Sequence, residues 1–156
     1  MRRELLAEGR KHLNMRLLQQ TPMIGSIRAV LLLALIQTPN CFRTKRQLWA
    51  YCGLALRTYT SGEYRVVGGQ LKRSKKFLAI RGLNLNHDLK NIFKSAATRA
   101  ASTDGPFQDF YQACLARGMK PHLARLTLAR KIAAITLLVW KKGVRFDAEH
   151  LKQQAA

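Results

Sequence analysis

The segment Thr-Pro-Met-Ile-Gly-Ser-Ile-Arg-Ala, residues 21–29, and the apolar run that follows it to Ile36 decide how this chain folds. Residues 2–20 before it carry leucines separated by charged residues, which predicts an amphipathic helix that is imperfect at Gly9. Pro and Gly within residues 21–25 favour a tight turn. The sequence therefore predicts two helices joined by a short connection.

This arrangement resembles a helix-hairpin-helix motif, in which the turn and the start of the second helix face a phosphate. Arg28 would add a charge-assisted contact. Gly25 is expected at a turn position with positive φ. Met23 stands where the motif usually has Gly, so this turn position is expected to be distorted. The alternative is a plain αα-hairpin that only contributes to the core.

The charge of the chain predicts its class of partner. Its 156 residues suit one domain, and 28 Lys+Arg against 8 Asp+Glu give a formal net charge of +20. Such an excess predicts a polyanionic partner, with DNA or RNA first and an anionic membrane surface second. The longest apolar run, Ala29 to Ile36, is too short to span a membrane, and no signal-peptide core precedes it. The odd, scattered cysteines argue against disulfides and zinc, and predict buried thiols in a reducing cytoplasm.

The stretch from Gly53 to Gly82 carries the densest positive charge. Tyr64, Val66 and Val67 suit a strand and Gly68-Gly69 a hairpin turn, so we expect a small β-hairpin or an ordered basic loop. Tyr59 and Tyr64 could stack on bases or close the hairpin. We expect DNA contacts from Gly25 and Arg28 and from this stretch, through Arg57, Arg65, Lys72, Arg73, Lys75, Lys76 and Arg81.

Ser61, followed by Gly62, lies within this basic stretch. Its hydroxyl could attack a phosphodiester if a base removes the proton and cations such as Arg57 and Arg65 stabilise the transition state. The chain itself offers no evident base. The alternative is that Ser61-Gly62 is only a polar turn.

The rest of the chain predicts a helical scaffold. Thr44 caps one helix with Gln47 as its partner, and Gly53 ends that helix. Asn86 or Asp88 starts the next, and Pro106 and Pro121 start two more. We expect the last helix to bury Leu123, Leu126, Ala129, Ala133 and Leu137, with Val144 and Phe146 folding back onto the core. The predicted fold is mainly α, a helix-hairpin-helix followed by a small basic β-hairpin or loop and a helical bundle.

Other catalytic chemistries find little support. The acidic residues are scattered and mostly suit helix starts, so we expect no metal site and no cofactor in this chain. His122-Leu-Ala-Arg125 has the His-x-x-Arg spacing of tyrosine recombinases, but no tyrosine follows it. His87 beside Asp88 could be a general base, although a helix cap explains it better.

Four segments occur together and in order: residues 21–29, 46–55, 60–64 and 128–133. With them the chain resembles the C-terminal half of the bridge-RNA-guided insertion-sequence transposases, which pair a RuvC-like DEDD nuclease domain with a C-terminal serine-bearing domain. The resemblance implies that Ser61 is the catalytic serine and that DNA is held with a guide RNA in an oligomeric synaptic complex. It also implies that the metal-binding acids, and hence Mg²⁺, belong to the RuvC-like half.

On this resemblance we expect three parts. Residues 1–19 are a linker helix that ends a longer helix, residues 20–146 are the transposase C-terminal domain with the helix-hairpin-helix at 13–37, and residues 147–156 are a polar tail. We expect a truncated or partial, nucleoid-associated cytoplasmic protein, inactive without a RuvC-like half or a full-length transposase. The alternative is a small non-catalytic basic protein that binds nucleic acid.

Overall fold

The computed structural model describes residues 2–55, 64–73, 86–149 and 151, and in this part the chain is mainly helical, as predicted. The helical elements are α1 (Arg2–Arg10), α2 (Leu13–Leu18), α3 (Ser26–Ile36), the 3-10 turn η1 (Pro39–Cys41), α4 (Lys45–Tyr51), α5 (His87–Ser102), α6 (Pro106–Ala116) and α7 (Pro121–Lys142). The strands β1 (Tyr64–Val67) and β2 (Gln70–Arg73) form an antiparallel hairpin.

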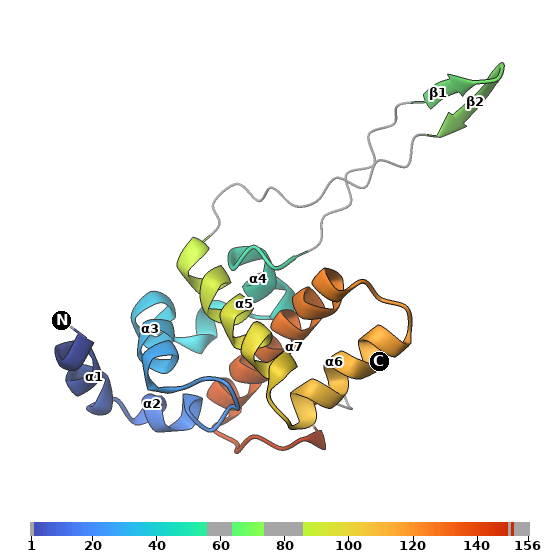
Figure 1. Cartoon of the computed structure of the whole chain (residues 1–156). Helices are drawn as coiled ribbons and strands as arrows, with labels where there is room; N and C mark the ends of the chain where they lie inside the picture. Colours follow the sequence, from blue (N-terminus) through green and yellow to red (C-terminus); the bar gives the residue numbers. More distant parts are fainter. Residues whose placement is uncertain (1, 56–63, 74–85, 150, 152–156) are drawn as a thin grey trace.

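The long helix α7 is the centre of the core. It packs against α5, α6, α4 and α2, and Figure 1 shows it passing behind α5. Small residues make the close α5–α7 contact possible: Ala96, Ala97 and Ala100 of α5 are buried, as are Ala129 and Ala133 of α7. The Ala-rich face predicted for α5 is thus confirmed as a packing face.

The apolar stripe predicted for α7 is partly wrong. Leu123 is exposed and Leu126 is half-buried, whereas Leu128, Ile132 and Ile135 are fully buried. Leu123 lies in the first turn of α7, where Pro121 to Leu123 are all exposed, whereas every residue from Lys131 to Leu137 is buried, so burial in α7 depends on the position along the helix and not on one face.

The single helix predicted over residues 2–20 is two helices. After α1 the chain turns, with the Lys11 amide donating to the Glu8 carbonyl (3.1 Å) and the His12 amide to the Gly9 carbonyl (3.0 Å). Both α1 and α2 pack on α3, and Gly9 is buried in that contact. The break follows Gly9, which packs closely on α3. This contact joins residues that are distant in the sequence, so the local pattern does not encode it.

The predicted helix starts are confirmed. The Thr44 hydroxyl accepts from the Gln47 amide (3.4 Å), and the Gln47 side chain accepts from the Arg43 amide (2.6 Å). The side chain of Asn86, rather than Asp88, caps α5 by accepting from the Leu89 amide (3.1 Å). Pro106 and Pro121 begin α6 and α7.

Gly53 ends α4 as predicted. Its φ of +65° allows two closing bonds, from the Gly53 amide to the Ala50 carbonyl (3.2 Å) and from the Leu54 amide to the Trp49 carbonyl (2.7 Å). This is the Schellman pattern, and the buried Leu54 supplies its usual hydrophobic contact. Trp49 in turn donates its Nε1 hydrogen to the Arg130 carbonyl (2.9 Å), which ties α4 to α7.

The β-hairpin has the predicted turn. Gly68 and Gly69 have φ of +61° and +77°, the signature of a two-residue turn that matches strand twist. Tyr64 pairs with Arg73 and Arg65 with Lys72 in the register of the two strands. Figure 1 shows the hairpin apart from the helices.

Two smaller expectations need correction. Cys52 and Cys114 are buried as predicted, and burial raises the pKa of the Cys52 thiol to about 12, but Cys41 is exposed. Phe146 folds back onto Phe107, with ring centroids 5.6 Å apart, whereas Val144 remains exposed. The local sequence does not distinguish these outcomes, because each depends on which helix passes nearby.

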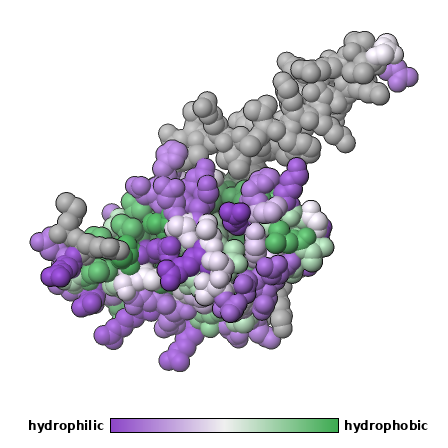
Figure 2. All heavy atoms as spheres, viewed as in Figure 1, coloured by the Kyte–Doolittle hydropathy of each residue, from purple (hydrophilic) through white to green (hydrophobic). Residues whose placement is uncertain are grey.

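The face of the molecule shown in Figure 2 is largely hydrophilic. Figure 2 shows polar side chains over most of the visible face, with hydrophobic ones reaching the surface near α1 and α3. None of the helices in the described part of the chain combines the length and the apolar character needed to cross a membrane.

We predict that Gly9→Ala destabilises the protein by about 1–3 kcal/mol, as overpacked cores do. A Cβ at this position would lie 2.5 Å from Val30 Cγ2 and 3.1 Å from Met15 Sδ, and Val30 is a stiff β-branched neighbour. Chemical denaturation measures the effect.

Val30→Ala provides the control, because it removes the methyl group that a Cβ on residue 9 would meet. In that background Gly9→Ala should cost nothing or stabilise the protein, since Ala is the better helix former. Additive losses in the double variant would contradict the proposed contact.

Candidate nucleic-acid interface

The structure describes five of the predicted DNA-contacting residues. Gly25 and Arg28 lie at the start of α3. Arg65 lies in β1, and Lys72 and Arg73 lie in β2, with Arg65 opposite Lys72 in the register. The other predicted site residues lie outside the described part of the chain: Arg57, Ser61, Lys75, Lys76 and Arg81.

The connection between α2 and α3 is a tight turn. The Ile24 amide donates to the Thr21 carbonyl (3.1 Å), with Pro22 and Met23 at the two central positions. Met23 has a φ of +70°, which together with Pro22 before it is the signature of a type II turn. Ile24 and Thr21 are buried, so the turn is anchored in the core on both sides. The position that normally requires Gly is occupied here by Met, as the sequence indicated.

The expectation of a positive φ at Gly25 is wrong. Gly25 has a φ of −74° and a ψ of 177° and is the N-cap residue of α3. Met23 already reverses the chain, so Gly25 needs only the extended backbone that a helix start requires. Gly25 has no side chain to cap α3, and the amides of a helix's first turn have no partner within the helix. The N-terminus of α3 is therefore free of a side-chain cap.

Arg28 holds the turn against α5. Its Nη1 donates to the Met23 carbonyl (3.0 Å), and its Nε and Nη2 donate to the Ser95 hydroxyl (3.3 and 3.2 Å). Ser95 in turn donates to the Ile92 carbonyl (3.0 Å). Arg28 thus links the strained residue of the turn to the middle of a neighbouring helix.

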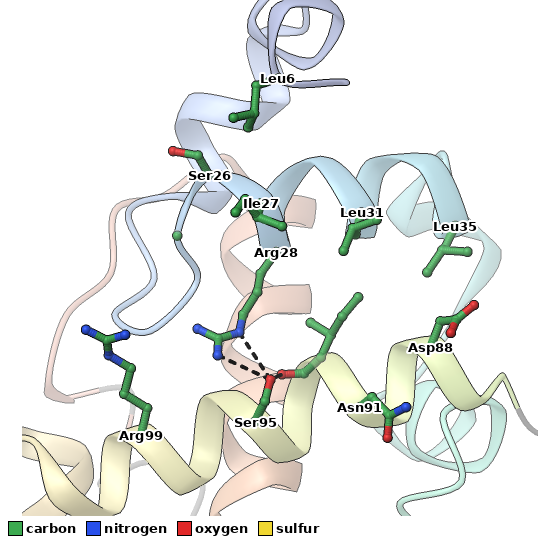
Figure 3. Close-up of a pocket in the computed structure, with 12 residues that line it drawn as sticks. Leu6, Ser26, Ile27, Arg28, Leu31, Leu35, Asp88, Asn91, Ser95 and Arg99 are labelled. Carbon is green, nitrogen blue, oxygen red and sulfur yellow. Dashed lines mark hydrogen bonds between the residues drawn. The ribbon is translucent and has the colours of Figure 1, made fainter. Parts of the chain in front are cut away.

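A groove of about 1020 Å³ lies between α1, the start of α3 and α5. Figure 3 shows Arg28 and Arg99 at one end of the groove and Asp88 at the other, with Leu31 and Leu35 along one side. Gly25 and Ser26 also line it, so the uncapped start of α3 opens into the same space as the two arginines. A group that accepts hydrogen bonds and carries negative charge would suit this end of the groove.

The two arginines at this end repel one another. Burial, and then the positive charge of Arg99, lowers the pKa of Arg28 from its ordinary value. Three of the N–H groups of Arg28 are used within the protein. The remaining donors, together with Arg99, leave positive charge that an anion between the two guanidinium groups would offset.

The model of the IS116/IS110/IS902 transposase family matches residues 15–112. The chain belongs to this transposase family. The matched region runs from α2 through most of α6, so it includes the turn, Arg28 and Arg99. Membership of this family implies that the chain has a role related to transposition and that it interacts with DNA. A search of curated proteins finds no match.

Arg99 and Ser95 belong to this candidate interface but were not predicted from the sequence. They lie four residues apart on α5, and the sequence shows only that they share a helix face. Arg28 lies 67 residues from Ser95 in the sequence, so its proximity to Ser95 and Arg99 depends on how α3 packs on α5.

His122 is an exposed residue in the first turn of α7, as expected. Among the residues described, no three His, Cys, Asp or Glu side chains gather as a metal site would require.

We predict that Met23→Gly is more stable than Met23→Ala by about 1 kcal/mol, because Ala is strained at positive φ and Gly is not. Both variants remove the half-buried Met side chain, so their difference isolates the backbone effect. Thermal or denaturant unfolding measures it.

Leu31 is the matched control, since it is half-buried in the middle of α3. There Leu31→Gly should be less stable than Leu31→Ala by about 1 kcal/mol. The same order of stabilities at residue 23 as at residue 31 would argue against strain in the turn.

Proposed function

We propose that this chain is the DNA-binding, serine-bearing half of a transposase, in which Ser61 attacks a DNA phosphodiester. The observation that carries the proposal is the start of α3, where an uncapped helix N-terminus and two arginines share one groove in a member of a transposase family. Backbone amides at a helix start together with guanidinium groups form an arrangement that binds phosphate. The α2–turn–α3 unit then acts as a helix-hairpin-helix that docks on the DNA backbone.

The hairpin adds to this interface. Arg65 and Lys72 occupy paired positions in the register of its two strands. Both are basic residues that suit a phosphate backbone beside the hairpin. Arg57, Lys75, Lys76 and Arg81, with Arg73, would extend the contact along the DNA.

The proposed chemistry is a transesterification. A bond forms between Ser61 Oγ and phosphorus while a P–O bond of the strand breaks, so the strand leaves with a free hydroxyl end and a phosphoserine link remains. The proton of Ser61 passes to a base, which we assign to a carboxylate of a RuvC-like half, and the departing oxygen of the strand takes up a proton from that acid or from water. That half would also bind Mg²⁺ and, with a guide RNA and further transposase copies, complete a synaptic complex at the nucleoid. Arg57 and Arg65 would stabilise the added negative charge.

A carboxylate placed at the N-cap tests docking at α3. Gly25→Asp should leave stability unchanged or raise it by up to about 1 kcal/mol, because Asp caps a helix and suits its dipole. The same carboxylate repels phosphate, so affinity for duplex DNA should fall about tenfold or more, measured by fluorescence anisotropy at fixed salt.

Thr44→Asp is the control for this change, because it also places Asp at an N-cap and also lowers the net charge by one. It should bind DNA almost as tightly as the parent chain. Equal losses in the two variants would mean that net charge alone governs binding, and docking at α3 would be refuted.

Substitution of the serine tests the chemistry. With a RuvC-like half supplied, Ser61→Ala should abolish covalent protein–DNA adducts and recombination while DNA affinity changes little, since one neutral hydroxyl adds little beside the cations. Denaturing gels detect the adducts. Ser74→Ala, in the same basic stretch, is the control and should remain active.

Adducts formed by the Ser61→Ala variant but absent from the Ser74→Ala variant would show that the nucleophile is misassigned. DNA binding without adducts in any chain, the parent included, would instead favour the alternative of a non-catalytic nucleic-acid-binding protein.

A further inference from the structure

A second cationic groove lies on another side of α5. It has a volume of about 360 Å³ and is bordered by Lys90, Lys94 and Thr98 of α5, His122 and Arg125 of α7, and Gly53 after α4. None of the described residues that line it is acidic. None of its cations belongs to the α3 interface.

Helix geometry explains why these side chains gather. Lys90, Lys94 and Thr98 follow one another at intervals of four residues, so they share one face of α5. His122 and Arg125 are three residues apart and share one face of α7. Because alanines bring α5 and α7 into close contact, the two cationic faces meet along the rim of that contact.

The groove is open to solvent. Lys94, Thr98, His122 and Arg125 are exposed, while Lys90 is half-buried. The Thr98 hydroxyl donates to the Lys94 carbonyl (3.0 Å), which leaves its oxygen as an acceptor and the ammonium and guanidinium groups as donors. Cations that converge without a carboxylate among them repel one another, which destabilises the protein unless an anion binds between them.

The position of the groove indicates which anion. Ala55 and Asn86 are the described residues on either side of the basic stretch, and the Asn86 amide donates to the Tyr51 carbonyl (3.2 Å) near the end of α4. Gly53 and Lys90 of the groove lie two and four residues from these two points. The chain thus enters and leaves the basic stretch close to the groove, so a polyanion that reaches this base of the stretch would also meet the groove.

We propose that this groove binds the phosphodiester backbone of a nucleic acid, as a contact separate from the start of α3. The inference rests on the proposed DNA-binding function and adds to it a second surface on the helical body. Lys90, Lys94 and Arg125 supply the charge, and a ring N–H of His122 supplies a further donor. The contact reads the backbone and not the bases, so it positions the polymer without selecting a sequence.

The double variant Lys94→Gln/Arg125→Gln tests the inference. In a plot of the logarithm of the affinity against the logarithm of the salt concentration, the slope of the variant should be smaller in magnitude than that of the parent chain by about 2. Near 0.1 M salt, its affinity should be about tenfold lower for each phosphate that is no longer bound. Titrations with duplex DNA and with an RNA hairpin separate the two sources of the backbone. A loss of affinity for either polymer supports the groove and identifies the polymer that uses it.

Lys142→Gln/Arg145→Gln is the matched control, since it also removes one exposed Lys and one exposed Arg. Lys142 lies at the other end of α7, about 26 Å along the helix from Arg125 at 1.5 Å per residue. This control should keep the salt slope of the parent chain, as should the charge-preserving variant Lys94→Arg/Arg125→Lys.

The outcomes separate the two proposals. No salt-dependent binding by the parent chain would overturn the proposed function itself. If binding by the parent chain depends steeply on salt, and the groove variant and its matched control lose equal affinity or neither loses any, the groove proposal alone would be overturned. An unchanged melting temperature in the groove variant shows that a lower affinity is not a folding defect.

Discussion

Burial of α7 is the constraint on which the rest of the molecule depends. All side chains from Lys131 to Leu137 are enclosed, so helices from both ends of the chain must be in place before this segment leaves water. The Trp49 ring extends the same packing, because it lies 4.3 Å below the Arg130 guanidinium carbon and donates its N–H to the backbone of α7. Contacts of α2 and α5 with α7, and of α3 with α2 and α5, fix the relative positions of the elements that form the candidate interface.

Lys131 is the one Lys or Arg among the described residues that this core encloses almost completely. Lys131 is only 7% exposed, and burial, then the charge of Lys45, lowers its pKa. Its ammonium lies 5.5 Å from the Phe110 ring, whose π face offsets part of the cost of burial. The other cations with described side chains are exposed or half-buried, and the chain has 28 Lys+Arg against only 8 Asp+Glu, which disfavours the isolated chain and favours its complex with a polyanion. Charge therefore links stability to binding in this protein.

The sequence predicted the features that short-range chemistry controls. The caps at Thr44 and Asn86 and the turn at Gly68-Gly69 follow from hydrogen bonds and φ preferences within a few residues. Features set by distant packing were not predictable in this way: the break after α1, the buried face of α7 and the exposure of Cys41. At the candidate interface Gly25 and Arg28 could be found from the sequence, whereas Arg99 could not, because it joins Arg28 only through the packing of α3 on α5.

At the turn before α3, Arg28 both stabilises the fold and lines the candidate interface. Met23 occupies a conformation that disfavours a side chain, and the Arg28 guanidinium holds its carbonyl in place. The same guanidinium lies near that of Arg99 in the groove, and repulsion between the two positive charges lowers the pKa of Arg28. A phosphate between them would remove that repulsion and strengthen the hold of Arg28 on the turn. DNA binding at this point would then stabilise the geometry that binds it, so order in the turn and occupancy of the groove are thermodynamically linked.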